Sequence, residues 1–217
     1  MPRIARGLAG GEIYHIINRG NRRSAVFHNS KDYEIFIELL QKAKEIADVK
    51  LYSFVLMPNH FHFLAEPNKA EDLSSYMQWL LTSYVRYYNK TYKTSGHLWQ
   101  GRYKSFIVQR DNYLFNVVNY IEQNPQRANL KNWKYTSINN KINHFVNELP
   151  IELPKDFREY KKILNEEEKK KIENSIQRQS PYGEEEWMNL TAEKYNIIST
   201  IKPRGRPRKQ KKNSELK

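Results

Sequence analysis

The stretch Met57-Pro58-Asn59-His60-Phe61-His62-Phe63-Leu64 organises the rest of the sequence. Its Pro-Asn pair is a turn signal, and the apolar and aromatic run that follows favours a β-strand. Because successive side chains of a strand point to opposite faces, His60 and His62 share one face, while Phe61 and Phe63 share the other. The pattern predicts a strand that presents two imidazoles on one side and is anchored in a core by the other.

The histidine pair alone allows two interpretations. It is either a metal site or a structural pair, since histidines two apart on a strand also occur without a metal. Neutral imidazoles suit Zn, Mn, Ni, Cu or Fe better than Ca. Two ligands do not complete a site, so a metal would need a third ligand from another part of the chain.

Positive charge dominates the whole chain. Its 217 residues carry 37 Lys and Arg against 24 Asp and Glu, a formal net charge of +13 and a pI near 9.7. This surplus favours a polyanionic partner, either a nucleic acid or, less often, an anionic membrane surface. The 15 Tyr, 9 Phe and 4 Trp suit base stacking, but they equally fit a large aromatic core under a solvated basic surface.

Several classes of protein are disfavoured by what the sequence lacks. The absence of cysteine excludes disulfides, thiolate zinc sites and iron–sulfur clusters, and it fits a cytoplasmic protein. No run approaches the roughly 20 apolar residues that span a bilayer, so we expect no membrane association. Residues 1–6 lack the apolar core of a secretory signal.

Alternating and helical patterns predict an α+β fold. We expect strands at residues 12–18, 50–57, 60–66 and 104–109. We expect helices at about residues 30–48 with Ser30 as N-cap, from 72 or 74 to 92, and from 111 or 112 to 124, where Pro125 ends the third. This order predicts a ferredoxin-like or RNA-recognition-motif-like antiparallel sheet, with helices packed mainly on one face.

The composition of the sequence changes near residue 147, after which charged residues become frequent. We therefore divide the chain into a main domain at residues 1–147, a charged helical extension at 148–201 and a basic tail at 202–217. The tail holds eight cations and one glutamate, a net +7 of the chain's +13. Such a segment cannot bury a core, so we expect it to be disordered when free.

Tyr120 and Asn124 supply what the histidine pair lacks. They are four residues apart on the third predicted helix, hence neighbours on one face. The Asn124 carbonyl oxygen would complete a three-ligand set on a divalent ion, and Tyr120 would stand beside that ion. Taken alone, Tyr120 is better explained as a core aromatic of an amphipathic helix.

A tyrosine beside a metal suits phosphoryl chemistry. A phenol, with a pKa of roughly 10, is a weak nucleophile at neutral pH. A metal that polarises a non-bridging phosphate oxygen would stabilise the charge developing on the phosphoryl group. The products would be a 5′-phosphotyrosine and a free 3′-OH. Because this exchange is reversible, it suits strand transfer better than degradation.

The motifs together resemble one family. Residues 14–21 read Tyr-His-Ile-Ile-Asn-Arg-Gly-Asn, residues 57–62 Met-Pro-Asn-His-Phe-His, residues 99–103 Trp-Gln-Gly-Arg-Tyr, and residues 120–128 Tyr-Ile-Glu-Gln-Asn-Pro-Gln-Arg-Ala. In this order they resemble the single-tyrosine transposases of the HUH endonuclease superfamily, and within it the bacterial REP-associated tyrosine transposases. The resemblance covers about residues 8–147.

The resemblance implies roles for individual residues. His60 and His62 correspond to metal ligands, Tyr120 to the nucleophile, and Asn124 to the polar residue four positions later. Asn124 stands where insertion-sequence members often have glutamine, whereas REP-associated members commonly have asparagine. The family uses Mg²⁺ or Mn²⁺ and acts on single-stranded DNA near a hairpin, so we expect a cytoplasmic, nucleoid-associated DNA nicking and rejoining enzyme.

DNA contacts are expected from cations and aromatics near these motifs. The candidates are Arg19, Arg22, Arg23, Trp99, Arg102, Arg127, Arg204 and Arg206. The last two lie in Pro203-Arg204-Gly205-Arg206-Pro207, which matches the core of an AT-hook for the narrow minor groove of A·T-rich duplex. The alternative is a generic basic tail with sequence-independent affinity.

Two matters stay open from sequence. The same fold without cleavage would be a regulator that binds hairpin DNA or RNA, although such a binder has no need of all four residues His60, His62, Tyr120 and Asn124. The oligomeric state is either monomer or homodimer, with the active site formed within one chain or shared between two.

Overall fold

The computed structural model describes residues 7–139, 144–151 and 164–202. It contains a four-stranded sheet in the order β2-β3-β1-β4, with every neighbouring pair antiparallel. The strands are β1 (Tyr14–Arg19), β2 (Val49–Met57), β3 (His60–Pro67) and β4 (Lys104–Ile107). The α+β class and the ferredoxin-like topology predicted from sequence are confirmed.

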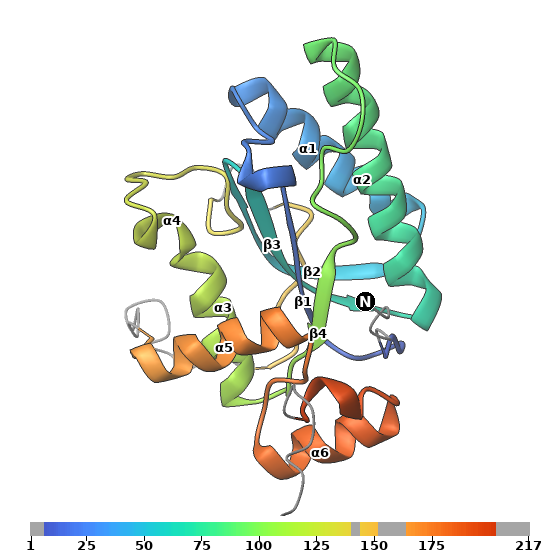
Figure 1. The fold of residues 1–217 in the computed structure, drawn as a ribbon, viewed down its shortest axis with the longest axis vertical. Helices are drawn as coiled ribbons and strands as arrows, with labels where there is room; N and C mark the ends of the chain where they lie inside the picture. The colour runs from blue at the N-terminus through green and yellow to red at the C-terminus, as the bar shows by residue number, and fades with distance from the viewer. Residues whose placement is uncertain (1–6, 140–143, 152–163, 203–217) are drawn as a thin grey trace, which may run out of the picture.

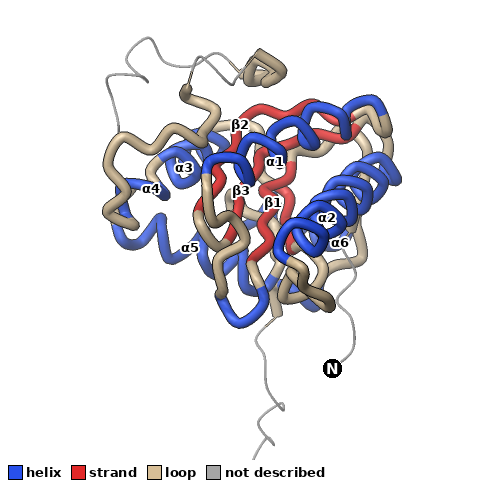
Figure 2. The backbone as a smooth tube through the Cα atoms, turned by 90° about the horizontal axis from the view of Figure 1, so that it is seen from above, coloured by secondary structure: helices blue, strands red, loops and turns tan. Residues whose placement is uncertain are grey.

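Two helices cross over one face of the sheet. They are α1 (Ser30–Lys42), which follows β1, and α2 (Ala70–Tyr92), which follows β3. Aromatic and aliphatic side chains of β1, β2 and β3 pack beneath them with Phe36, Leu40, Tyr76 and Tyr84, all at most 1% exposed. Figure 2 shows α1 and α2 on one side of the strands.

The opposite face carries helices too, which corrects the expectation that helices pack mainly on one face. There α3 (Asn112–Glu122) and α5 (Glu166–Arg178) cover a second cluster that includes Val55, Leu64 and Phe106 of the strands. Strand residues of both parities are apolar, so both faces of the sheet need cover. The remaining helices are α4 (Asn124–Arg127) and α6 (Glu185–Lys194), and α6 lies beyond the end of the sheet (Figure 1).

Several predicted boundaries shift by a few residues. The first helix ends at Lys42, and a single 3-10 turn (Ala43–Glu45) replaces its predicted last part. Its N-cap is Asn29 instead of Ser30, because the Asn29 side chain accepts from the backbone N–H of Asp32 in a capping box. The predicted Asp111 cap of α3 is confirmed by its bond to the N–H of Tyr113.

The division of the chain at residue 147 stays a prediction. Phe145 packs into the cluster under α1 and α2, whereas Leu149, Ile151 and Ile172 pack against the cluster under α3. The segment after residue 147 thus contributes to the packing of the main domain. The predicted tail begins at residue 202, and its residues 203–217 lie outside the described part of the chain.

Candidate active site

Strand β3 presents its histidines as the alternation predicted. Phe61 and Phe63 are fully buried in the cluster under α1 and α2. His60 and His62 point to the other face, where α3 lies. They pair with Arg19 and Ile17 of the neighbouring strand β1. The two imidazole centres are 5.1 Å apart.

Each histidine has its Nδ1 atom held by a polar side chain. His60 Nδ1 lies 2.6 Å from Asn59 Oδ1, and His62 Nδ1 lies 2.9 Å from Nε2 of His15. Since the Asn59 oxygen can only accept, the His60 proton belongs on Nδ1, and Nε2 keeps its lone pair. An imidazole with its Nδ1 fixed in this way is oriented to coordinate through Nε2.

Burial keeps these imidazoles neutral. Desolvation, with a smaller contribution from the charge of Arg19, lowers the pKa of His60 to about 4. The pKa of His62 lies well below its ordinary value, chiefly because the side chain is buried and then because His15, His60, Arg127 and Arg19 disfavour a further positive charge. Neutral imidazole is the form that ligates metals.

The turn between α3 and α4 brings Tyr120 and Asn124 to the histidines. The Asn124 Nδ2 group donates to the carbonyl oxygen of Tyr120 over 2.9 Å, which leaves the amide oxygen Oδ1 available. The Tyr120 ring centre lies 5.7 Å from that of His62, with the ring planes 78° apart. The predicted proximity of these residues is therefore confirmed, while their roles stay predictions.

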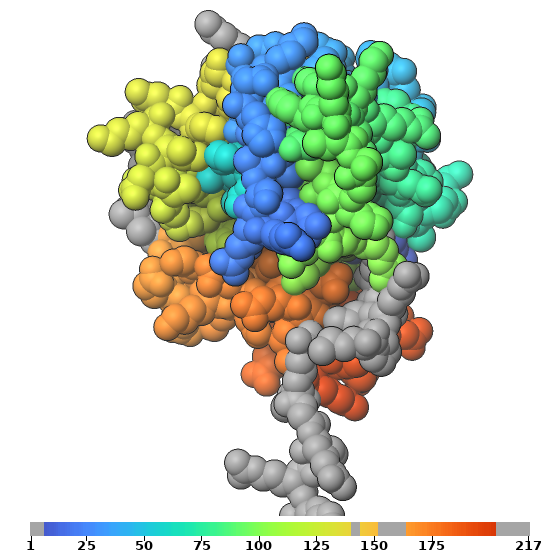
Figure 3. All heavy atoms as spheres, turned by 45° about the horizontal axis from the view of Figure 1, so that its top comes forward, coloured from blue at the N-terminus to red at the C-terminus, as the bar shows by residue number. Residues whose placement is uncertain are grey.

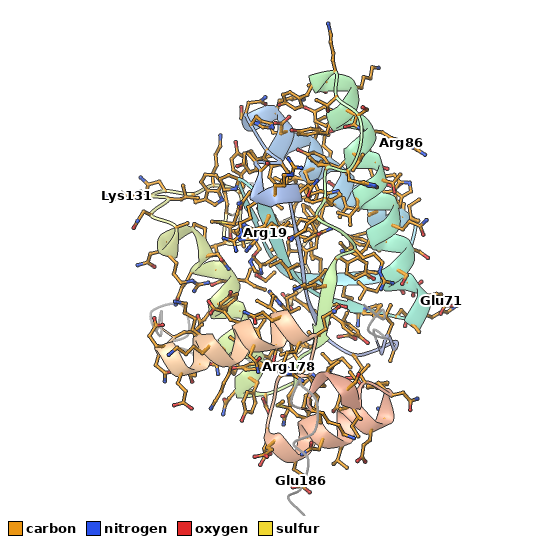
Figure 4. All side chains as sticks on the ribbon, viewed as in Figure 1. Arg19, Glu71, Arg86, Lys131, Arg178 and Glu186 are labelled. Atoms are coloured by element: carbon orange, nitrogen blue, oxygen red, sulfur yellow. The ribbon has the colours of Figure 1, made fainter. Side chains whose placement is uncertain are left out.

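All four side chains line one pocket of about 730 Å³. Its rim is rich in cations, namely Arg19, Arg23, Arg102 and Lys104, and Glu173 of α5 lines it as well. Figure 4 shows Arg19 near the centre of the molecule, whereas Lys131, Arg86 and Glu186 lie at its periphery. Figure 3 shows the cyan atoms of the β2–β3 region between the blue segment after β1 and the yellow segment after α4. Because four cations line it, the pocket suits an anionic ligand such as a phosphodiester.

Tyr120 sits between opposing electrostatic influences. The side chain is 7% exposed, and this burial raises the pKa of Tyr120 above its ordinary value. Arg127 and Arg19 lower the same pKa, whereas Glu173 raises it. The guanidinium carbon of Arg127 lies 4.4 Å from the ring centre, close enough for a cation–π contact.

The remaining predicted DNA contacts fall into three groups. Arg19, Arg23 and Arg102 line the pocket, and Arg22 is exposed beside it on the turn after β1. Trp99 is 8% exposed and packs against Phe61 and Tyr84, so its indole supports the core. Arg204 and Arg206 lie outside the described residues.

Sequence reasoning missed three residues of the site. It did not foresee that His15, which is 0% exposed, contacts His62. It also missed Lys104 and Glu173, which reach the pocket from β4 and α5. His15 alternates in step with Ile13 and Ile17, so the sequence indicates that the three side chains share one face of the strand. Only the pairing of β1 with β3 shows that this face brings His15 to His62.

The donor set fits a divalent ion. Two neutral imidazoles and one amide side chain line a common pocket, and their nitrogen and oxygen atoms form a combination acceptable to Mn²⁺ and, less readily, to Mg²⁺. Within the described residues, no three His, Cys, Asp or Glu side chains gather into a metal cluster. A site here would thus depend on the amide of Asn124 as its third protein ligand.

Comparison with known proteins decides the family. The model of the family described as "Transposase IS200 like" matches residues 11–124, more than half of the chain. The chain belongs to the IS200-like transposase family. The match begins before β1 and ends at Asn124, so it spans the two histidines, the tyrosine and the asparagine.

One solved structure supports the fold. The structure of a REP-associated tyrosine transposase bound to a REP hairpin matches with a TM-score of 0.52 and 17% identity, covering 71% of this chain and 91% of the other. A putative transposase from Deinococcus radiodurans matches with a TM-score of 0.40 and 19% identity, covering 57% and 97%. Curated protein sequences give no significant match. The predicted resemblance is confirmed for family and fold, and a role as a transposase acting on DNA follows from the family.

Membrane association was not expected for such a protein. Among the helices of the described residues, none is both long and apolar enough to cross a bilayer.

Proposed function

We propose that this IS200-like transposase is a metal-dependent, single-tyrosine enzyme that nicks and rejoins single-stranded DNA beside hairpin elements. One observation carries the proposal. His60 and His62 of β3, Tyr120 of α3 and Asn124 of α4, all singled out from sequence, line a single pocket with a cationic rim. All four belong to one chain, which supports a site that is complete within a monomer.

The reaction would start at the hydroxyl of Tyr120. Its oxygen forms a bond to the phosphorus, and the bond between phosphorus and the 3′ oxygen of the preceding nucleotide breaks. The phenol proton goes to solvent, and the released 3′ oxygen takes up a proton from solvent. Tyr120 then carries a 5′-phosphate, and attack by another 3′-OH reverses the exchange and joins a different strand.

The chain's own residues would prepare this step. His60, His62 and the Asn124 amide would hold a Mg²⁺ or Mn²⁺ ion, which when bound supplies charge stabilisation at the reacting phosphate. Arg19, Arg23, Arg102 and Lys104 would bind the flanking phosphates and orient the strand in the pocket. Arg127 would stabilise the phenolate form of Tyr120.

Hairpin DNA is the substrate that we favour. The structural relative named above was solved with a REP hairpin, and four cations line the pocket of this chain, which suits the phosphates of a DNA strand. A·T-rich duplex near the hairpin is proposed as a second target, through the arginines of the basic tail.

The test uses Tyr120→Phe and a matched control, Tyr113→Phe. Tyr113 lies on the same helix but contacts Tyr182 at a ring distance of 5.3 Å and does not line the pocket. With single-stranded DNA from the flanks of the gene and Mn²⁺, the unaltered chain and Tyr113→Phe should form a covalent adduct that shifts on a denaturing gel. Tyr120→Phe should bind the same DNA and form none. An adduct with Tyr120→Phe would refute the assigned nucleophile.

A non-cleaving regulator is the competing function. It predicts hairpin binding that a chelator leaves intact and no adduct under any metal. If the unaltered chain binds hairpin DNA but forms no adduct with Mn²⁺ or Mg²⁺, the regulator is the better description.

A further inference from the structure

His15 is buried at the back of the pocket, behind a proposed metal ligand. Its side chain is 0% exposed, and its Nε2 lies 2.9 Å from Nδ1 of His62. The two rings stack with their centres 5.0 Å apart, and Phe106 packs against His15 at 4.9 Å. His15 itself does not line the pocket.

The second nitrogen of His15 has no use in the fold. Within the described part of the chain, the buried Nδ1 atom finds no hydrogen-bond partner. A buried polar atom without a partner destabilises a protein, so an apolar side chain would serve the core better at this position. The histidine therefore calls for a reason other than packing.

The contact between the two histidines admits two proton arrangements. Either His15 donates from Nε2, and His62 then carries its own proton on Nε2 facing the pocket, or His62 donates from Nδ1 to His15, and its Nε2 faces the pocket as a bare lone pair. Only the second arrangement lets His62 coordinate through Nε2.

The charges around the pocket favour the second arrangement. Arg19 lines the pocket, and both Arg19 and Arg127 act on His62 with positive charge. A positive environment is better matched by a lone pair than by an N–H pointing into it. The His15 side chain is fully buried, which favours the neutral imidazole, and a neutral imidazole can accept a hydrogen bond.

We propose that His15 is a positioning residue, which accepts the Nδ1 proton of His62 and so holds the Nε2 lone pair of His62 toward the pocket. Asn59 does the same for His60, so each ring has its own fixed partner. The proposal rests on the assignment of His62 as a metal ligand in the proposed function. It adds a residue that touches neither the metal nor the DNA.

Mn²⁺ binding measured by calorimetry on the full chain tests the idea. His15→Phe keeps the ring volume and removes the acceptor, whereas His15→Gln keeps an acceptor oxygen. Loss of an outer partner typically weakens metal binding 10- to 100-fold, so His15→Phe should fall in about that range and His15→Gln should stay within a few-fold of the unaltered chain. His15→Phe should also bind hairpin DNA in chelator as well as the unaltered chain does, which separates a loss of metal affinity from a loss of folding.

A nitrogen-15 NMR spectrum of the metal-free, unaltered chain gives an independent answer. It should show the proton of the neutral His62 on Nδ1. A proton on Nε2, or unchanged Mn²⁺ affinity in His15→Phe, would overturn the role of His15 and leave the proposed function standing. The metal part of the proposed function fails instead if the unaltered chain binds no Mn²⁺ and if His60→Ala changes neither DNA binding nor adduct formation.

Discussion

Arg127 holds Tyr120 by two contacts. Its guanidinium carbon lies 4.4 Å from the centre of the Tyr120 ring, and its Nη2 donates to the Tyr120 carbonyl oxygen over 2.6 Å. The first contact places a positive charge beside the phenol, and the second fixes the arginine to the backbone of the same residue. Arg127 is thus bound to the residue whose ionisation it favours, although sequence alone suggested only a DNA contact.

Removing this charge should make Tyr120 harder to ionise. Arg127→Gln is expected to raise the pKa of Tyr120, so the rising limb of adduct formation against pH moves to higher pH. At neutral pH the single-turnover rate should fall, by up to about tenfold for each unit by which the pKa of Tyr120 rises. Lys131→Gln, an exposed charge a few residues away, is the control and should leave the profile unchanged. An Arg127→Gln profile that superimposes on the original would contradict this role.

The acidic neighbour should act with the opposite sign. Glu173 of α5 raises the pKa of Tyr120, so Glu173→Gln should move the rising limb to lower pH and increase the rate at neutral pH. Glu167 is on the same helix, is exposed and does not line the pocket, which makes Glu167→Gln the matched control. A slower Glu173→Gln enzyme at every pH would instead indicate that the carboxylate takes part in the reaction.

Asn124 should contribute through its amide oxygen. Asn124→Ala removes the proposed third ligand, and we expect Mn²⁺ affinity to fall by at least about tenfold. Asn124→Asp supplies a carboxylate oxygen at the same place and should bind Mn²⁺ at least as tightly as the original chain. Calorimetric titration measures both, with the exposed Gln126→Ala as the control. Equal affinity in Asn124→Ala and the original would remove Asn124 from the ligand set.

The site divides into parts that local sequence could predict and parts that it could not. The period of a strand placed His60 and Phe61 on opposite faces, and the four-residue spacing kept Asn124 near Tyr120 although α3 ends at Glu122 and Asn124 begins α4. Both relations depend on short spacing along the chain. The contact of His15 with His62 depends on how β1 pairs with β3, which no local pattern encodes.

The same limit explains the helices on the second face of the sheet. Alternation along β2 and β3 indicated an anchored strand, but it did not show that α5, more than a hundred residues later, would cover the face that carries the histidines. The run of charges at residues 166–171 favoured a solvated helix or a linker. Ile172 is nevertheless fully buried, and Ile176, four residues later on the same face, packs against the same cluster, so these two side chains dock the charged helix.

Fold stability should depend on a buried carboxylate far from the pocket. Asp32 is 0% exposed and accepts from the hydroxyls of Tyr87 and Tyr92 and from the backbone N–H of His28. It joins the start of α1 to the end of α2. Asp32→Ala would leave these donors unpaired and should lower the free energy of unfolding by about 2–4 kcal/mol. Urea denaturation measures the change, and the exposed Glu34→Ala should alter it by less than about 0.5 kcal/mol.

The basic tail should govern how binding responds to salt. Residues 202–217 carry a net +7, and each phosphate contact contributes about −0.9 to the slope of log affinity against log salt concentration on duplex DNA. Deleting them should weaken binding to a hairpin with an A·T-rich stem and flatten that slope. Adduct formation at saturating DNA should persist, because His60, His62, Tyr120 and Asn124 all precede the deletion. Replacing Arg204 and Arg206 by lysine keeps the charge, so a loss of A·T preference in that variant would indicate minor-groove recognition by the arginines. An unchanged salt slope after the deletion would show that the tail does not contact DNA.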